Sequence, residues 1–206
     1  MDTPGRPGPP QPPLGSDEEL RQRLSLLAPA HTMRGLFFNS VLEVVRNLAD
    51  QTAVQRCLAA SGETKFQDLA SYPTGTFLRM LYTAGHVLSG KFGSFEGALR
   101  PLGSRTMMKF LASAAGKALQ GVAEDDPQRL IANIPLVHKM VLMGGDCTVK
   151  SLGSNRSLLV IERISTPAAF IEGALQMTLE AARVRGVRVT SRQTGSLDAE
   201  FEVSWT

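Results

Sequence analysis

The run CTVKSLGSNRSLLVIERI, residues 147–164, decides the fold class. It contains two segments rich in β-branched and aliphatic residues, Cys147–Leu152 and Arg156–Ile164. The residues between them, Gly153-Ser154-Asn155, are typical of the turn in a β-hairpin. The pattern therefore predicts an antiparallel strand pair in the last third of the chain.

A helix and a second hairpin are predicted to follow. Ser165-Thr166-Pro167 supplies an N-cap and a first-turn proline for a helix over Ala168–Arg183, with Glu172 on its exposed face. Val187–Thr194 and Ala199–Trp205 then alternate as strands of a hairpin. Together the segments predict a small, largely antiparallel four-stranded sheet interrupted by one crossover helix.

Apolar spacing and capping residues predict that the first two thirds of the chain are helical. Thr32 is the predicted cap of the second one. The expected ranges are 17–27, 34–49, 52–61, 76–91, 94–102, 104–120 and 128–132, followed by a segment from Asn133 that holds His138. The predicted fold class is α+β, with the N-terminal helical part packed on the sheet.

Composition indicates one domain behind a leader. Six prolines fall within the first thirteen residues, which predicts a disordered Pro/Gly-rich leader over residues 1–16 and a single α+β domain over 17–206. The leader has no signal-peptide pattern, and no segment approaches the roughly 20 apolar residues of a membrane span. We therefore expect a cytoplasmic protein without a membrane partner.

The residue types argue against several classes of chemistry. The only cysteines, Cys57 and Cys147, lie far apart and outside any metal-binding spacing, and Cys57 reads as a core residue. Neither a nucleophile elbow nor a phosphate-binding glycine motif occurs. We expect no enzyme activity, no metal and no cofactor.

One basic cluster bears on nucleic-acid binding. The net charge is only +3, and no aromatic residues interleave with the cluster to stack bases. Cross-strand pairing in the last hairpin would place Arg192 opposite Glu200 and Arg188 diagonal to Glu202. We therefore predict a solvated face and no nucleic-acid partner. The cluster consists of Arg183, Arg185, Arg188 and Arg192.

The C-terminal half resembles the superfamily shared by haem–nitric-oxide-binding (H-NOX) and 4-vinyl-reductase domains, with vesicle-tethering TRAPP subunits as cousins. The resemblance rests on the long helix after Tyr72, the Asn133-Ile-Pro-Leu-Val-His138 phrase, the strand pair, the Pro167-led helix and the final hairpin. It implies the same α+β fold.

A closer likeness covers nearly the whole ordered chain. It rests on Thr32-Met-Arg-Gly-Leu-Phe-Phe-Asn39, on Tyr72-Pro73 with Phe77-Leu78-Arg79, and on Arg192-Gln-Thr-Gly-Ser-Leu-Asp198 with Phe201 and Trp205. These phrases resemble an uncharacterised paralogous family of myxobacteria. The likeness implies a bacterial origin and a fold, and it implies no activity.

The H-NOX resemblance makes His138 a candidate haem ligand, because such domains present histidine from a phrase like Asn133–His138. Their haem propionates are held by Tyr-x-Ser-x-Arg, whereas this chain has Glu162-Arg-Ile-Ser-Thr-Pro167. We expect that His138 does not bind iron. The cysteines frequent in 4-vinyl-reductase relatives are replaced by Ala168, Ala169 and Ala199, which excludes a thiolate site there.

Small residues in Phe110–Gly116 favour either close helix packing or a space for a ligand. We predict a non-enzymatic ligand-binding or sensor-like module for a small apolar molecule, bound between the 104–120 helix, the His138 helix and the sheet. The candidate lining residues are His138, Met108, Leu111, Ala115, Met140 and Met177. The alternative is an interaction or scaffold module whose 34–49 helix binds a protein partner or a second copy of the chain; a haem-based gas sensor ranks third.

Overall fold

The computed structural model describes residues 12–123, 126–143 and 145–206, with the side chains of residues 122–123 and 140–143 also outside the description. The helices are α1 (Asp17–Ser25), α2 (Gly35–Leu48), α3 (Gln51–Ser61), α4 (Thr74–Phe92), α5 (Phe95–Ala112), α6 (Ala114–Ala123), α7 (Pro127–Val141) and α8 (Ala168–Ala181). The strands are β1 (Thr32–Arg34), β2 (Ser71–Pro73), β3 (Leu142–Met143), β4 (Asp146–Gly153), β5 (Arg156–Glu162), β6 (Arg188–Gln193) and β7 (Ala199–Ser204).

The larger sheet confirms the predicted α+β class. Its strand order is β4-β5-β7-β6 and every neighbouring pair is antiparallel, with α8 as the crossover between β5 and β6. Phe201 and Val203 of β7 are fully buried, whereas Glu200 and Glu202 point to the opposite face. This alternation follows from the two-residue period of a strand with one buried face.

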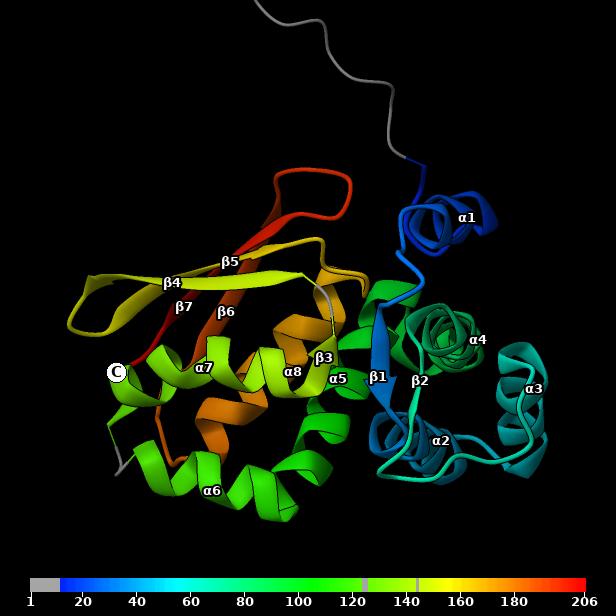
Figure 1. Cartoon of the computed structure of the whole chain (residues 1–206), viewed down its shortest axis with the longest axis horizontal. Coiled ribbons are helices and arrows are strands. Elements are labelled where there is room, and N and C mark those ends of the chain that lie inside the picture. The colour runs from blue at the N-terminus through cyan, green and yellow to red at the C-terminus, as the bar shows by residue number, and fades with distance from the viewer. Residues whose placement is uncertain (1–11, 124–125, 144) are drawn as a thin grey trace, which may run out of the picture.

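Helices cover the buried face of this sheet. Helix α7 packs on β4 and α8 packs on β6, while α5 lies along α8. Figure 1 shows these helices beneath the sheet, with α2, α3 and α4 grouped at the other end of the molecule. Buried residues from Met33 to Trp205 contribute to one hydrophobic cluster, which joins the helical part to the sheet.

A second sheet of very short strands was not predicted. Its order is β2-β1-β3, and β1 pairs antiparallel with both neighbours. Thr32, expected to cap the second helix, lies in β1, and Arg34 occupies the N-cap position instead. Tyr72 and Pro73 belong to β2, and Pro73 is also the N-cap residue of α4, so this strand leads directly into the helix.

Two prolines lie inside helices that the sequence analysis divided. Helix α5 continues through Pro101 and ends at Ala112, so the expected boundary near Gly103 is wrong. Helix α7 continues through Pro135, so the segment from Asn133 is not separate from the helix before it. Contacts of α5 with α8 and of α7 with β4 hold these helices together despite the missing proline N–H groups.

Glu172 is buried, so its predicted place on the exposed face of the helix is wrong. Its residue exposure is only 8%. One carboxylate oxygen accepts hydrogen bonds from the backbone N–H and hydroxyl of Ser191, and the other accepts one from Arg100 Nε at 2.7 Å. These donors replace water, which makes burial of the charge tolerable.

The last hairpin places its charged residues across the strands in the predicted register. Arg192 lies opposite Glu200 and donates to it at 2.6 Å, as predicted. Arg188 lies opposite Ser204 and therefore diagonal to Glu202, as predicted, while Glu202 forms its ion pair with Arg156 of β5. Residues 1–11 of the expected leader lie outside the described residues. Across the described part of the chain, no helix has both the length and the apolar content to cross a membrane.

Candidate ligand-binding site

An apolar groove lies between the start of α2, the junction of α5 with α6, and α7. Its volume is about 610 Å3, which is within the range of small-molecule sites. We call this feature the α2–α6 groove. Its lining residues are Arg34, Leu36, Phe37, Asp68, Leu69, Phe110, Ser113, Ala114, Ala115 and Val137.

The floor of the α2–α6 groove consists of two aromatic rings. Phe37 and Phe110 are each 5% exposed, and their rings are nearly parallel, with centroids 5.8 Å apart and an interplanar angle of 23°. Phe37 lies in the first turn of α2, and Phe110 lies in the last turn of α5. Packing between these two helices therefore buries both rings at the base of the groove.

The shape of the groove depends on a sharp change of direction after α5. Ser113 is extended between α5 and α6, and its hydroxyl oxygen accepts a hydrogen bond from the Gly116 N–H. A Cβ atom at Gly116 would lie 2.3 Å from the carbonyl oxygen of Phe110, so only glycine permits this close approach. The small side chains of Ala114 and Ala115 then leave one wall of the groove open.

The rim of the groove carries two opposite charges and an exposed leucine. Leu69 is 87% exposed, and its backbone is held because Arg34 Nη1 donates to the Leu69 carbonyl at 2.7 Å. The carboxylate of Asp68 accepts a hydrogen bond from Asn39 Nδ2 at 2.7 Å. The N–H of Leu36 donates to the Asp68 carbonyl, which fixes this loop on the start of α2.

The structure brings only part of the predicted site together. Ala115 lines the groove, and Leu111 is buried beside Phe110. Met108 is 53% exposed, and Met177 packs partly buried against the main core. The side chain of Met140 lies outside the described residues. His138 is half-buried on α7, directly after the groove residue Val137.

The third wall of the groove also differs from the expectation. It is formed by α2 and the Asp68–Leu69 loop, whereas the prediction placed the sheet there. Phe37 lies within the predicted 34–49 helix, but no local pattern showed that it would meet Phe110. Their separation of more than 70 positions hides this contact from any reading of short motifs.

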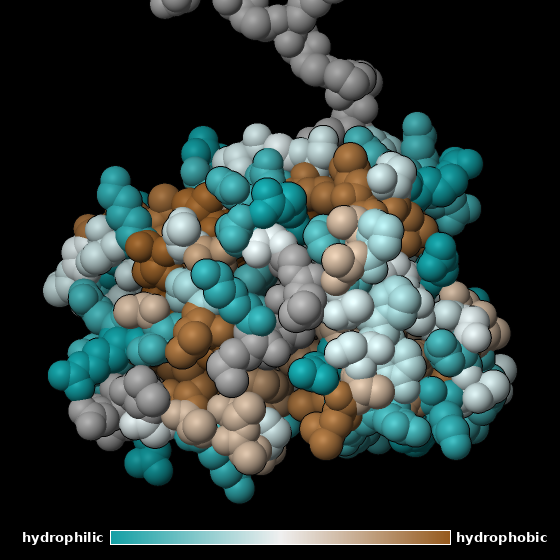
Figure 2. All heavy atoms as spheres, in the orientation of Figure 1, coloured by the Kyte–Doolittle hydropathy of each residue, from teal (hydrophilic) through white to brown (hydrophobic). Residues whose placement is uncertain are grey.

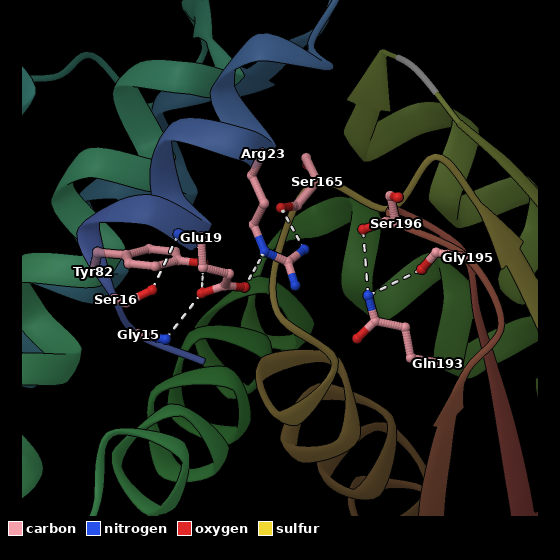
Figure 3. A network of polar contacts seen from close by, with 9 residues as sticks. All are labelled: Gly15, Ser16, Glu19, Arg23, Tyr82, Ser165, Gln193, Gly195 and Ser196. Carbon is pink, nitrogen blue, oxygen red and sulfur yellow. Dashed lines mark hydrogen bonds and ion pairs between the residues drawn. The ribbon is translucent and has the colours of Figure 1, made fainter. Parts of the chain in front are cut away.

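A second cavity, of about 290 Å3, lies beside α1 and is mostly polar. Figure 3 shows Arg23 reaching from α1 toward Ser165, with Gln193 on the far side. Gln193 Nε2 donates to the carbonyls of Gly195 and Ser196, and Arg23 Nη1 donates to the Ser165 carbonyl. These polar groups are largely satisfied by one another.

The wall of this polar cavity contains a buried ion pair. Glu19 and Arg23, one helical turn apart, are 2.5 Å from each other, and each residue is 6% exposed. Glu19 also accepts hydrogen bonds from the Tyr82 hydroxyl at 2.6 Å and from the Gly15 N–H at 2.9 Å. Burial, together with the adjacent Glu19 carboxylate, keeps the pKa of Tyr82 well above its ordinary value, although the positive charge of Arg23 acts in the opposite direction. The network fixes α1 on α4.

The side chains after β5 do not fit haem propionates. Arg163 is exposed and pairs with Asp146 at 2.5 Å, so its guanidinium is already engaged at the surface. Its neighbour Ile164 is buried and apolar, and the Ser165 carbonyl is occupied by Arg23. The one guanidinium of the Glu162–Pro167 segment is thus paired at the surface, and no tyrosine hydroxyl accompanies it, so the segment lacks the combined donors that two carboxylates require. We conclude that the residues present do not form a haem site.

Metal and thiol chemistry have no evident centre in the described part of the chain. Within it, no three histidine, cysteine or acidic side chains gather in a way that could hold a metal ion. Cys57 and Cys147 are both buried and free. Burial raises the pKa of each thiol to about 11, which keeps them protonated and unreactive at neutral pH.

The arrangement of helices and sheet is that of H-NOX proteins. The Fe(II) unliganded H-NOX protein from K. algicida matches with a TM-score of 0.68 and 16% identity, covering 84% of this chain and 97% of that one. An H-NOX protein from S. oneidensis in the Fe(II)NO ligation state matches with a TM-score of 0.63 and 12% identity, covering 84% and 99%. At such low identity the likeness shows the fold alone.

The chain itself belongs to the family described as protein of unknown function (DUF2378), whose model matches residues 26–206. No curated protein matches the chain. The expected H-NOX resemblance is confirmed at the level of fold. The likeness to 4-vinyl-reductase domains and TRAPP subunits, and the myxobacterial origin, stay predictions.

Proposed function

We propose that this DUF2378 protein is a non-enzymatic ligand-binding module that holds a small apolar molecule in the α2–α6 groove. The observation that carries the proposal is the groove itself, with its aromatic floor and aliphatic walls. Burying apolar ligand surface contributes roughly 25 cal/mol per Å2, so such a surface supplies affinity without any charged anchor. A sensor-like role would follow if ligand binding changed the contacts of the groove with another protein.

The alternative is a scaffold whose helical surface binds a protein partner. The exposed residues of α2 are Glu43, Arg46 and Asn47, all of them polar. Figure 2 shows hydrophobic side chains in several separate groups on the viewed face, divided by hydrophilic ones. Interfaces of stable complexes usually have a contiguous apolar centre, so the concave groove favours a small molecule over a protein partner.

The proposal is tested with N-phenyl-1-naphthylamine, an uncharged aromatic probe whose fluorescence rises in apolar surroundings. We expect saturable binding at one site per chain. Ala115→Phe places a large ring in the groove and should weaken the probe at least about tenfold, because roughly 1.4 kcal/mol of lost contact suffices for that factor. Ala115 is exposed, so the larger side chain is compatible with folding.

Ala118→Phe is the matched control, because Ala118 is also exposed on α6 but does not line the groove. It should leave the affinity of the probe unchanged. Absence of saturable binding, or equal effects of the two substitutions, would refute the assignment of the groove as a ligand site.

A further inference from the structure

We infer that the α2–α6 groove selects an apolar molecule bearing an anionic group, and that Arg34 is the residue that recognises this group. The inference rests on the proposed function, because it concerns the same groove. It adds the chemical class of the ligand and a residue that determines specificity.

The preference for an apolar body follows from the lining of the groove. The rings of Phe37 and Phe110 stack on each other and are each only 5% exposed, so they close the base of the groove with aromatic carbon. Leu36, Leu69 and Val137 add aliphatic carbon around them. Burying apolar ligand surface against this lining supplies affinity. The open wall at Ala114 and Ala115 leaves room for a bulky ligand.

The anionic preference follows from the hydrogen bonds at the rim. Arginine has five N–H donors, and Arg34 uses one of its groups, Nη1, to hold the Leu69 carbonyl. Among the residues that the structure describes, no carboxylate pairs with Arg34. Donors therefore remain for a carboxylate, sulfonate or phosphate at the mouth of the groove.

Asp68 is the charge at the rim that opposes this arrangement. Its Oδ1 accepts the hydrogen bond from Asn39, which turns one side of the carboxylate toward its own loop. The remaining negative charge still repels an anionic ligand, so Asp68 should lower the affinity that Arg34 provides. Neutralising Arg34 and neutralising Asp68 should therefore change the affinity for an anionic ligand in opposite directions.

The test compares two probes with the same aromatic framework. 1-Anilinonaphthalene-8-sulfonate carries a sulfonate, and N-phenyl-1-naphthylamine lacks it. We expect the sulfonate to bind about two- to fivefold more tightly relative to the neutral probe, which is the scale of an exposed ion pair. Arg34→Gln should remove this preference, and Asp68→Asn should increase it by a similar factor while retaining an oxygen for Asn39. The readout is the ratio of the two affinities in each variant, which separates the effect on the sulfonate from any effect on the apolar part of the probe.

Arg46→Gln is the matched control, because Arg46 is exposed on α2 and does not line the groove. It should leave the preference intact, and the preference should decrease as salt is raised to about 0.5 M. An equal affinity for the two probes in the unmodified protein, or an unchanged preference in Arg34→Gln, overturns the inference. If Ala115→Phe still weakens binding of the neutral probe, the proposed function survives that outcome. If the neutral probe does not bind in the groove at all, the proposed function and the inference about Arg34 both fail.

Discussion

A Cβ atom at Gly103 of α5 would lie 1.9 Å from the carbonyl oxygen of Phe170 in α8. The contact is reciprocated, since a Cβ atom at Gly173 would lie 2.0 Å from the carbonyl oxygen of Arg100. The two helices therefore meet backbone to backbone. Because α5 also supplies Phe110 to the floor of the α2–α6 groove, this contact connects the crossover helix of the sheet with the candidate site.

Gly103→Ala should lower the free energy of unfolding by about 3 kcal/mol, because the added methyl group forces the two backbones apart. Urea denaturation followed by circular dichroism measures the change. Gly90→Ala is the control: a Cβ atom there meets nothing within 4 Å, and alanine should raise stability by about 0.5–1 kcal/mol through its better helix propensity. Equal effects of the two substitutions would contradict the close contact.

Tyr82→Phe removes the hydroxyl that donates to Glu19 at 2.6 Å. The buried carboxylate then lacks one of its donors, which should cost about 1–3 kcal/mol of unfolding free energy. The loss should be local, so hydrogen exchange of the α1 amides should accelerate more than that of α8. Unchanged protection of α1 would show that the network with Arg23 does not hold this helix.

The two buried thiols should make stability fall at alkaline pH. Their pKa values are raised from an ordinary 9 to about 11 in the folded protein, so the folded state keeps protons that the unfolded state releases. The contribution of Cys57 and Cys147 is complete below pH 9 and is lost as pH rises toward 11. A variant with alanine at both positions should show a shallower decline of melting temperature over that interval. An identical decline would contradict the assignment to the thiols.

Haem supplementation should not produce a stoichiometric Soret band in the purified protein. Arg163 is engaged by Asp146, and the residues that follow it, Ile164–Pro167, add no further guanidinium to neutralise two propionates. Absorption spectra of the unmodified protein and of His138→Ala, recorded after haem addition and gel filtration, should be alike. A band that disappears in His138→Ala would show that His138 binds the iron and would make the chain a haem protein.

The sheet could be predicted from the sequence because its information is local. Alternation in Ala199–Trp205 and the turn at Gly153-Ser154-Asn155 each act over a few residues. The strands β1, β2 and β3 were missed because two or three residues are too short to show a period. The expected breaks near Gly103 and Asn133 were wrong, because α5 and α7 continue through Pro101 and Pro135, where contacts with distant elements outweigh the local cost of proline within a helix.

The candidate site was only partly predictable for a related reason. The small residues around Ala115 indicated an open space, and the structure places that space beside α6. Phe37 and the Asp68–Leu69 loop could not be foreseen as its other walls, because their contacts with α5 depend on tertiary packing. Glu172 was predicted to lie on the exposed face of its helix, and its burial depends on donors from Arg100 and Ser191.

The most direct test of the account is a methyl NMR titration with N-phenyl-1-naphthylamine. If the probe binds in the α2–α6 groove, the largest shifts should occur at four residues that line it. These are the methyl groups of Leu36, Leu69, Ala115 and Val137. The methyl groups of Leu159 in the sheet should be unaffected, because this residue is buried away from the groove. Largest shifts around the sheet, or no saturable shifts at the four groove residues, would contradict the assignment of the groove as the binding site.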